Sequence, residues 1–176
     1  MIQFQAPNLE KVKSALESRG ATGVVFQDDS VHAVIGRERS FDVIRSIKDD
    51  AELQFKYFTD VTGADYSKYS EPQPESFAVI YSLLSPVLGV RVQLRVYLPE
   101  ADPSVSSISS LFAGANWGER EVYDMYGFDF RGHPSLTRLL TPDSFEGHAL
   151  RKDYPLKGRG ERSSFPVYEA VPGHNS

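Results

Sequence analysis

The sequence contains no cysteine among its 176 residues. This absence excludes a disulfide framework, a thiolate zinc site, a cysteine nucleophile and a Cys-ligated iron–sulfur cluster. A chain of this length buries roughly 70% of the surface that it exposes when unfolded, so a hydrophobic core can stabilise it without a covalent or metal crosslink. We therefore expect one main domain, and its composition is compatible with a reducing compartment.

Two nucleotide-binding loops and the zinc-protease helix are also missing. No G-x-G-x-x-G lies between a predicted strand and helix, no G-x-x-x-x-G-K-[ST] occurs, and no two histidines flank a glutamate at i, i+4 spacing. His133 and His148 each follow a glycine, and folding could bring them together with Asp143 or Glu146 in a metal-dependent hydrolytic site. The simpler interpretation is two turn histidines that form local hydrogen bonds.

Long apolar runs and an excess of basic residues are lacking as well. The longest uncharged stretch, 76–90, is shorter than the ~20 apolar residues of a membrane helix, and the N-terminus lacks the pattern of a secretory signal. The net charge of -5 argues against general nucleic-acid binding, although residues 131–176, with seven basic and five acidic side chains, are mildly positive. We expect a cytoplasmic protein that meets the membrane only through a partner.

The residues that are present alternate between helical and strand periodicity, which predicts an α+β domain. Helices are expected over 8–20, with Asn8 as cap and Gly20 as stop, and over 37–53. A Ser-rich helix after Asp102 and a helix over 116–125 that stops at Gly127 are expected to follow the strands. The predicted sheet is mixed and mostly antiparallel, with strands at 23–27, 31–36, 55–62, 77–84 and 90–98, the last two forming a hairpin.

After this domain, assigned to residues 1–130, the chain is rich in glycine and proline. We interpret residues 131–176 as an extended C-terminal arm. Ordering about forty residues that lack regular structure costs conformational entropy that a small domain does not offset. The arm is therefore predicted to dock on a partner surface, with residues 148–176 having little fixed structure in the free protein.

The densest chemistry lies between residues 115 and 155. Glu119, Arg120, Glu121 and Asp124 fall within six residues of one predicted helix. Exposed ion pairs contribute under ~1 kcal/mol, so stability does not explain this crowding. We expect Arg120, with its acidic neighbours, to form charge-assisted bonds with a partner or with the arm, whereas the simpler interpretation is a solvated helix face.

Four motifs of this region occur in the order and spacing of a known family. The segments Glu119-Arg120-Glu121, Asp124-Met125-Tyr126-Gly127, Gly132-His133-Pro134 and Arg151-Lys152-Asp153-Tyr154-Pro155 closely resemble the signature of the thirty-kilodalton subunit of respiratory complex I, which is the C subunit of the NADH:quinone oxidoreductase. The departures, Thr137 and Ser144-Phe145, concern lineage rather than family. The resemblance implies a non-catalytic scaffold subunit of the peripheral arm of this proton-pumping enzyme, on the cytoplasmic side of the bacterial cell membrane.

The resemblance also implies partners. The chain would dock on the D subunit near the quinone site and contact neighbouring iron–sulfur subunits, while other subunits bind the flavin, the iron–sulfur clusters and the quinone. An equivalent subunit of a ferredoxin-dependent photosynthetic dehydrogenase or of a membrane-bound hydrogenase is the alternative within this group. The predicted partner interface consists of Glu119, Arg120, Glu121, Asp124, His133, Pro134, His148, Arg151, Lys152, Asp153 and Tyr154.

Overall fold

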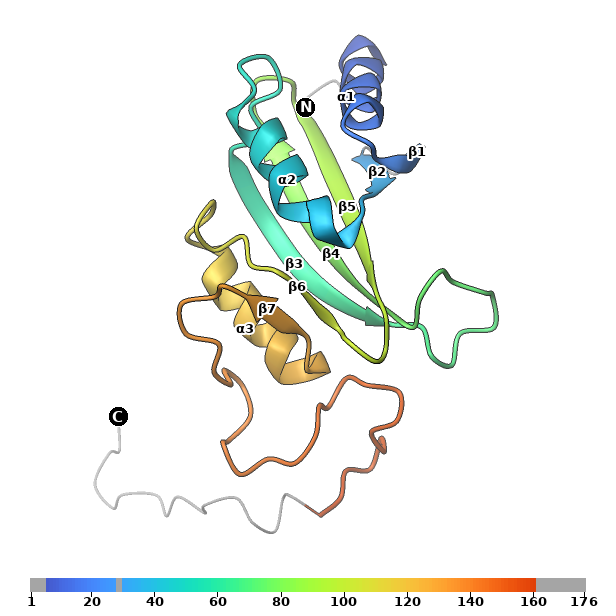
Figure 1. Ribbon diagram of the computed structural model, residues 1–176, viewed down its shortest axis with the longest axis vertical. Coiled ribbons are helices and arrows are strands. Elements are labelled where there is room, and N and C mark those ends of the chain that lie inside the picture. Colours follow the sequence, from blue (N-terminus) through green and yellow to red (C-terminus); the bar gives the residue numbers. More distant parts are fainter. Residues whose placement is uncertain (1–5, 28–29, 161–176) are drawn as a thin grey trace, which may run out of the picture.

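The computed structural model describes residues 6–27 and 30–160, and it has the predicted α+β fold with a mixed, mostly antiparallel sheet. Three helices pack on one face of a five-stranded sheet (Figure 1). The strands, in spatial order, are β1 (Thr22–Gln27), β2 (Ser30–Val34), β5 (Val90–Leu98), β4 (Phe77–Ser85) and β3 (Tyr57–Asp65). The helices are α1 (Ala6–Ser18), α2 (Ser40–Asp49) after a short 3-10 turn (Arg37–Arg39), and α3 (Ala115–Tyr126).

The sheet pairs strands that lie far apart in the sequence. The predicted hairpin of β4 and β5 is confirmed, with Val79 opposite Val96 and Leu83 opposite Val92. In the centre of the sheet β2 runs parallel to β5, and the other three pairs are antiparallel. The parallel contact makes β2 and β5 neighbours although α2, β3 and β4 separate them in the chain.

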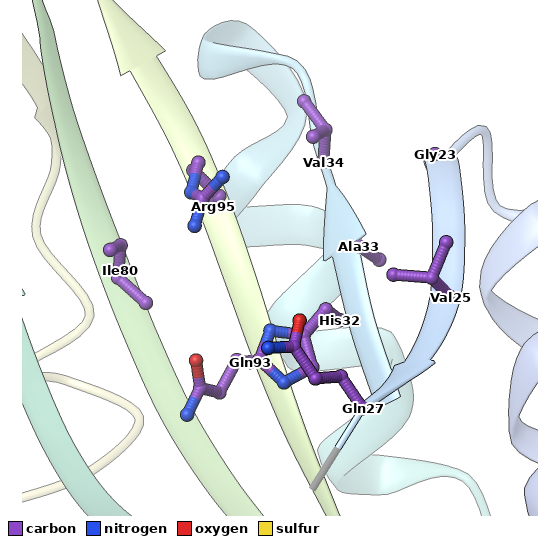
Figure 2. A pocket seen from close by; sticks show the side chains of 9 residues that line it. All are labelled: Gly23, Val25, Gln27, His32, Ala33, Val34, Ile80, Gln93 and Arg95. Carbon is purple, nitrogen blue, oxygen red and sulfur yellow. The ribbon is translucent and has the colours of Figure 1, made fainter. Parts of the chain in front are cut away.

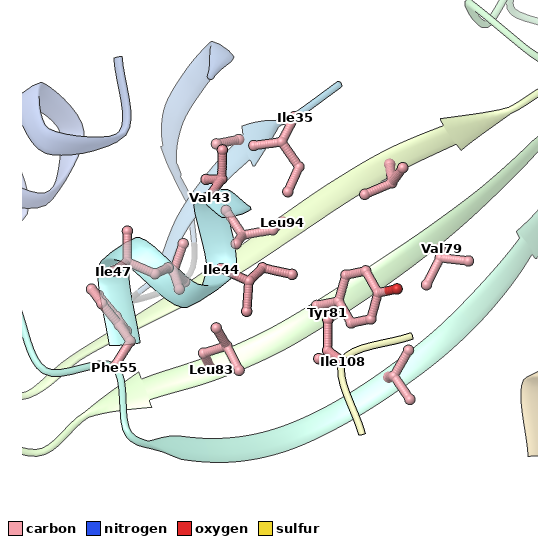
Figure 3. Close-up of a cluster of buried hydrophobic side chains, with 14 of the residues drawn as sticks. Ile35, Val43, Ile44, Ile47, Phe55, Val79, Tyr81, Leu83, Leu94 and Ile108 are labelled. Atoms are coloured by element: carbon pink, nitrogen blue, oxygen red, sulfur yellow. The ribbon is translucent and has the colours of Figure 1, made fainter. Parts of the chain in front are cut away.

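The hydrophobic core lies between the sheet and α2 (Figure 3). Alternate residues of β4 and β5 point into it because side chains on a strand alternate between its two faces. Helix α2 contributes residues at helical spacing, and burying each large side chain stabilises the fold by about 1.5–3 kcal/mol. The fully buried members include Ile44, Ile47, Phe55, Tyr81, Leu83 and Leu94.

Helix α3 packs closely on the edge strand β3, and two glycines make the close approach possible. A Cβ atom added to Gly63 would lie 2.5 Å from the ring of Tyr126, and one added to Gly118 would lie 2.5 Å from Val61. Gly127 ends α3 with a φ of 72°, the left-handed conformation that glycine adopts without strain. The predicted helix stop at Gly127 is therefore confirmed.

Two local predictions are wrong. The Ser-rich segment after Asp102 is not a helix: β6 (Ser104–Ser106) pairs in parallel with β7 (Asp129–Arg131), and turns follow it. Serine side chains compete with helical hydrogen bonds, and here the hydroxyl of Ser104 donates to Asp102. Asn8 does not cap α1, because the helix begins at Ala6 and the Asn8 side chain donates instead to the carbonyl of Leu88.

The predicted arm begins within a strand, since β7 spans the proposed boundary at residue 130. Residues 132–160 contain no helix or strand and run as turns past the C-terminal end of α3 (Figure 1). The remainder of the predicted arm, residues 161–176, lies outside the described residues. Among the helices that the structure describes, none has the length and apolar character to cross a lipid bilayer.

Candidate partner interface

The charged helix α3 directs two of its acidic side chains into the protein. Glu119 and Asp124 are both 0% exposed. Each holds a different irregular loop against the helix. In the described chain the acceptor oxygens of both carboxyl groups are occupied by internal hydrogen bonds, so their part in the predicted partner interface stays a prediction.

Glu119 holds the turn that follows β6. Its carboxyl group accepts hydrogen bonds from the Ser107 hydroxyl at 2.5 Å and from the backbone N–H of Ile108 at 2.7 Å. The Nε2 atom of His133 lies 4.0 Å from the same carboxyl group. Burial raises the pKa of Glu119 to about 7, because the bonds from Ser107 and Ile108 only partly compensate for lost solvation.

Asp124 holds the turn at residues 138–141. One carboxylate oxygen accepts the backbone N–H groups of Leu139, Leu140 and Thr141 at 2.7–2.9 Å. The other accepts from the Arg138 guanidinium at 2.8 Å and from the Thr141 hydroxyl. Burial alone would raise the pKa of Asp124, but the hydrogen bonds from Thr141, Leu140 and Arg138 outweigh it and hold the pKa far below its usual range.

Arg120 bonds with the chain's own arm, one of the two predicted outcomes. Its Nε donates to the carbonyl of Thr137 at 3.1 Å and its terminal nitrogen donates to that of Arg138 at 2.9 Å. The guanidinium also lies 5.1 Å from the ring centre of Trp117. Arg120 and Asp124 thus clamp the same turn, one through carbonyl groups and the other through N–H groups.

The two candidate histidines lie at different ends of α3. The Nε2 atom of His133 is 3.1 Å from the carbonyl of Asn116, whereas the Nδ1 atom of His148 is 2.9 Å from that of Asp124. Eight residues of helix separate these carbonyls by about 12 Å. The histidines therefore do not converge as the hydrolase alternative requires, and within residues 6–27 and 30–160 no group of three or more potential ligands could hold a metal ion.

The Arg-Lys-Asp-Tyr-Pro motif attaches the chain to the sheet edge. Arg151 donates to the carbonyl of Tyr126 at 2.5 Å, and its guanidinium lies 5.0 Å from the ring centre of Phe77. The backbone N–H of Lys152 donates to Asp65 at 2.7 Å. These contacts correct the expectation of little fixed structure for the first residues of the 148–176 segment, because the domain itself supplies their hydrogen-bond partners.

Several predicted interface residues remain exposed: Glu121, Pro134, Lys152 and Asp153. Tyr154 is half-buried and its ring packs 5.5 Å from that of Phe145. Large apolar side chains of the same region are also exposed. One of them, Trp117, is 59% exposed and was not predicted from the sequence as an interface residue. The available signal was its helical spacing, since Trp117 shares the polar face of Arg120 and Glu121. The exposed apolar residues of this region are Trp117, Leu140, Leu150 and Leu156.

Comparisons with known proteins agree on one family. Residues 33–160 match the family described as the respiratory-chain NADH dehydrogenase 30 kDa subunit. Subunit 5 of the NADH-quinone oxidoreductase of Thermus thermophilus is 40% identical over 154 residues, covering 83% of this chain and 73% of that protein. The C subunit of the same enzyme from Ralstonia pickettii is 38% identical over 169 residues, covering 93% of this chain and 84% of its own length.

Solved structures show the same fold. The trypsin-resistant fragment (1–134) of Nqo5 superposes with a TM-score of 0.66 at 36% identity, covering 73% of this chain and 99% of the fragment. A chain of the membrane-bound sulfane sulfur reductase, an archaeal respiratory membrane complex, superposes with a TM-score of 0.71 over 95% of this chain and 96% of its own, at 20% identity. This chain belongs to the family of 30 kDa subunits, also called C subunits, of NADH-quinone oxidoreductase, respiratory complex I.

Proposed function

We propose that this chain is a non-catalytic scaffold subunit in the peripheral arm of a proton-pumping NADH:quinone oxidoreductase, docked on the D subunit near the quinone site. It would lie on the cytoplasmic side of the cell membrane, where the iron–sulfur subunits are its further neighbours. In this proposal the other subunits carry the flavin, the iron–sulfur clusters and the quinone. This chain would contribute by holding its neighbours in place.

The observation that carries the proposal is the exposed apolar surface of α3 and residues 132–160. Leu140, Leu150 and Leu156 are at least half exposed, although they belong to a segment that hydrogen bonds hold in one conformation. Apolar and aromatic side chains on a preformed surface bind a partner with little ordering cost. Trp117 is suited to be an anchor, because tryptophan and arginine dominate the binding energy of protein interfaces.

The remaining predicted interface residues have graded roles in this proposal. Glu121, Pro134, Lys152 and Asp153 are exposed and can contact the D subunit directly. The half-buried residues Arg120, His133, His148, Arg151 and Tyr154 would position that surface through the bonds and ring contacts described above.

A related complex is a weaker candidate. The likeness to the sulfane sulfur reductase chain is at 20% identity and concerns the fold alone. The relatives at 38–40% identity are NADH-quinone oxidoreductase subunits. This difference favours the quinone enzyme over a ferredoxin-dependent dehydrogenase or a membrane-bound hydrogenase.

Co-purification with the D subunit tests the proposal. Leu150→Asp introduces a charge at an exposed apolar position of the arm, and Val87→Asp does the same at an exposed position in the β4–β5 turn as a matched control. We expect Leu150→Asp to reduce the amount of the D subunit that co-purifies by about tenfold or more, with Val87→Asp unchanged. Equal recovery of that partner with both variants would contradict docking through this segment.

A further inference from the structure

The sheet has a second face, and no helix of the described chain packs on it. Side chains of β2, β4 and β5 that alternate with the core residues point to this side (Figure 2). The loop at residues 66–76 covers one end, where the Tyr97 hydroxyl donates to Gln73. We call the uncovered remainder the open sheet face; its central residues are Ser30, His32, Val34, Ile80, Ser82, Leu84, Arg91, Gln93 and Arg95.

The register brings the polar residues of the open sheet face into adjacent rows. Gln93 lies between Ser82 and His32, and the rows on either side are centred on Arg91 and Arg95. Two hollows flank the Gln93 row. One of about 130 Å³ is lined by His32, Gln93 and Arg95, and the other of about 380 Å³ is lined by His32, Gln93 and Arg91.

Among the described residues, the two arginines of this face have no acidic partner. No ion pair within 4.0 Å joins Arg91 or Arg95 to a carboxylate anywhere in the described part of the chain. Asp60 is the one acidic residue lining the two hollows, and it too lies outside every such pair. The Nε atom of Arg95 is buried without a hydrogen-bond acceptor, an arrangement that is unfavourable until an acceptor arrives.

We propose that the open sheet face binds an acidic segment of a partner protein, whose carboxylates pair with Arg91 and Arg95. Arg91 and Arg95 lie four residues apart on β5, which places their Cα atoms roughly 13 Å from each other, so side chains of one extended or helical segment can reach both. Gln93 and His32 lie between them and can hydrogen-bond the polar groups of that segment. This inference rests on the proposed function only in that the chain works within an assembly of proteins.

A protein fits this face better than a lipid surface does. The charged groups line two hollows that side chains can enter, and Ile80 lies within the same surface as Arg95 and offers apolar contact.

Site-directed photocrosslinking in the assembled complex tests this inference. A photoreactive residue in place of Val25, which is exposed at the rim of the smaller hollow, should crosslink to one acidic stretch of a partner protein that mass spectrometry identifies. Exchanging both arginines for glutamate (R91E with R95E) should lower the yield by about tenfold or more. Arg45→Glu on the helical side is the matched control and should leave the yield unchanged.

Two further measurements make the outcomes distinct. The milder pair R91Q with R95Q, checked for native circular dichroism, shows whether an effect of the glutamate variants is only misfolding. An unchanged yield in folded variants, a crosslinked segment without Asp or Glu, or crosslinking to no protein while the chain binds phosphatidylglycerol vesicles would overturn the inference. Loss of the D subunit in Leu150→Asp together with normal crosslinking at Val25 separates this surface from the proposed docking segment.

Discussion

The two ends of α3 each bury an acidic side chain, but the surroundings of the two carboxyl groups differ. Each end buries a carboxyl group completely, yet the pKa of Glu119 is raised to about 7 while that of Asp124 is strongly lowered. Glu119 accepts bonds from one hydroxyl and one N–H group. Asp124 accepts from three N–H groups, a hydroxyl and a guanidinium. The loss of solvation around Glu119 and the number and charge of the donors around Asp124 together decide which of the two acids is ionised.

Helix α3 therefore holds a loop at each of its ends through a buried carboxyl group, a role that its composition did not indicate. The end at Asp124 is held by an ionised carboxylate whose hydrogen bonds fix the turn that carries Leu140. The end at Glu119 is held by the hydrogen bonds of that carboxyl group to Ser107 and Ile108, and its stability depends on whether the carboxyl group is protonated. Both acids hold loops of the surface that we propose for docking.

Removing the charge of Asp124 should have the largest effect. Asp124→Asn puts an amide donor against other donors, so we expect a loss of about 3 kcal/mol in the free energy of unfolding, as for a broken buried ion pair. Urea denaturation measures it, with the exposed Asp153→Asn as the matched control. Equal free energies of unfolding for the two variants would show that the hydrogen bonds of the Asp124 carboxylate do not stabilise the fold.

The helix itself can be displaced from the sheet without touching either acid. Gly63→Ala places a methyl group 2.5 Å from the Tyr126 ring, and we expect a loss of about 2 kcal/mol from overpacking. Gly36→Ala is the control, because no atom lies within 4 Å of its added Cβ and its φ of -66° suits alanine. Thermal unfolding compares the two variants, and an unchanged unfolding temperature of Gly63→Ala would mean that α3 shifts to accommodate the methyl group at little cost.

The charge state of Glu119 predicts a pH dependence of opposite sign to that of an ordinary paired acid. Its pKa is higher in the folded chain than the usual 4.5, so the folded state holds the extra proton between these values. Stability should therefore fall as pH rises from about 4.5 to about 7, by at most about 3 kcal/mol. For Asp124, whose pKa is lowered, the stabilisation is present above its usual pKa and is lost in strong acid.

Glu119→Gln is the test of that slope. Glutamine resembles the protonated acid, so the variant should lose the decline between about pH 4.5 and 7 and become more stable than the parent above it. The exposed Glu121→Gln should leave the slope unchanged. Parallel pH profiles of parent and Glu119→Gln would show that folding does not raise the pKa of Glu119.

Arg120 should have the smallest effect on stability and the clearest optical one. Arg120→Ala removes two bonds to carbonyl groups and the contact with Trp117, and we expect a loss of about 1 kcal/mol. Because the chain contains one tryptophan, its fluorescence reports this site alone. Easier quenching by the neutral quencher acrylamide is expected in the variant, and identical quenching would mean that the guanidinium does not rest on the ring.

Sequence alone predicted the parts of the fold that depend on periodicity. The strict alternation at 90–98 predicted β5, and the spacing of Phe41, Ile44 and Ile47 predicted α2. Val105 and Ile108 are buried although the Ser-rich segment that carries them is not the predicted helix, because burial periodicity and backbone conformation are separate properties. The four motifs around α3 likewise determined the family from the sequence.

Tertiary structure decided what those motifs do. The parallel pairing of β2 with β5 and the return of residues 138–152 to α3 and β3 join segments far apart in the chain, which local patterns do not encode. In the sequence Glu119 and Asp124 are two similar acids on one charged helix. The fold alone determines how many donors reach each of them, because hydrogen bonds from distant N–H groups form only once those groups have been brought together.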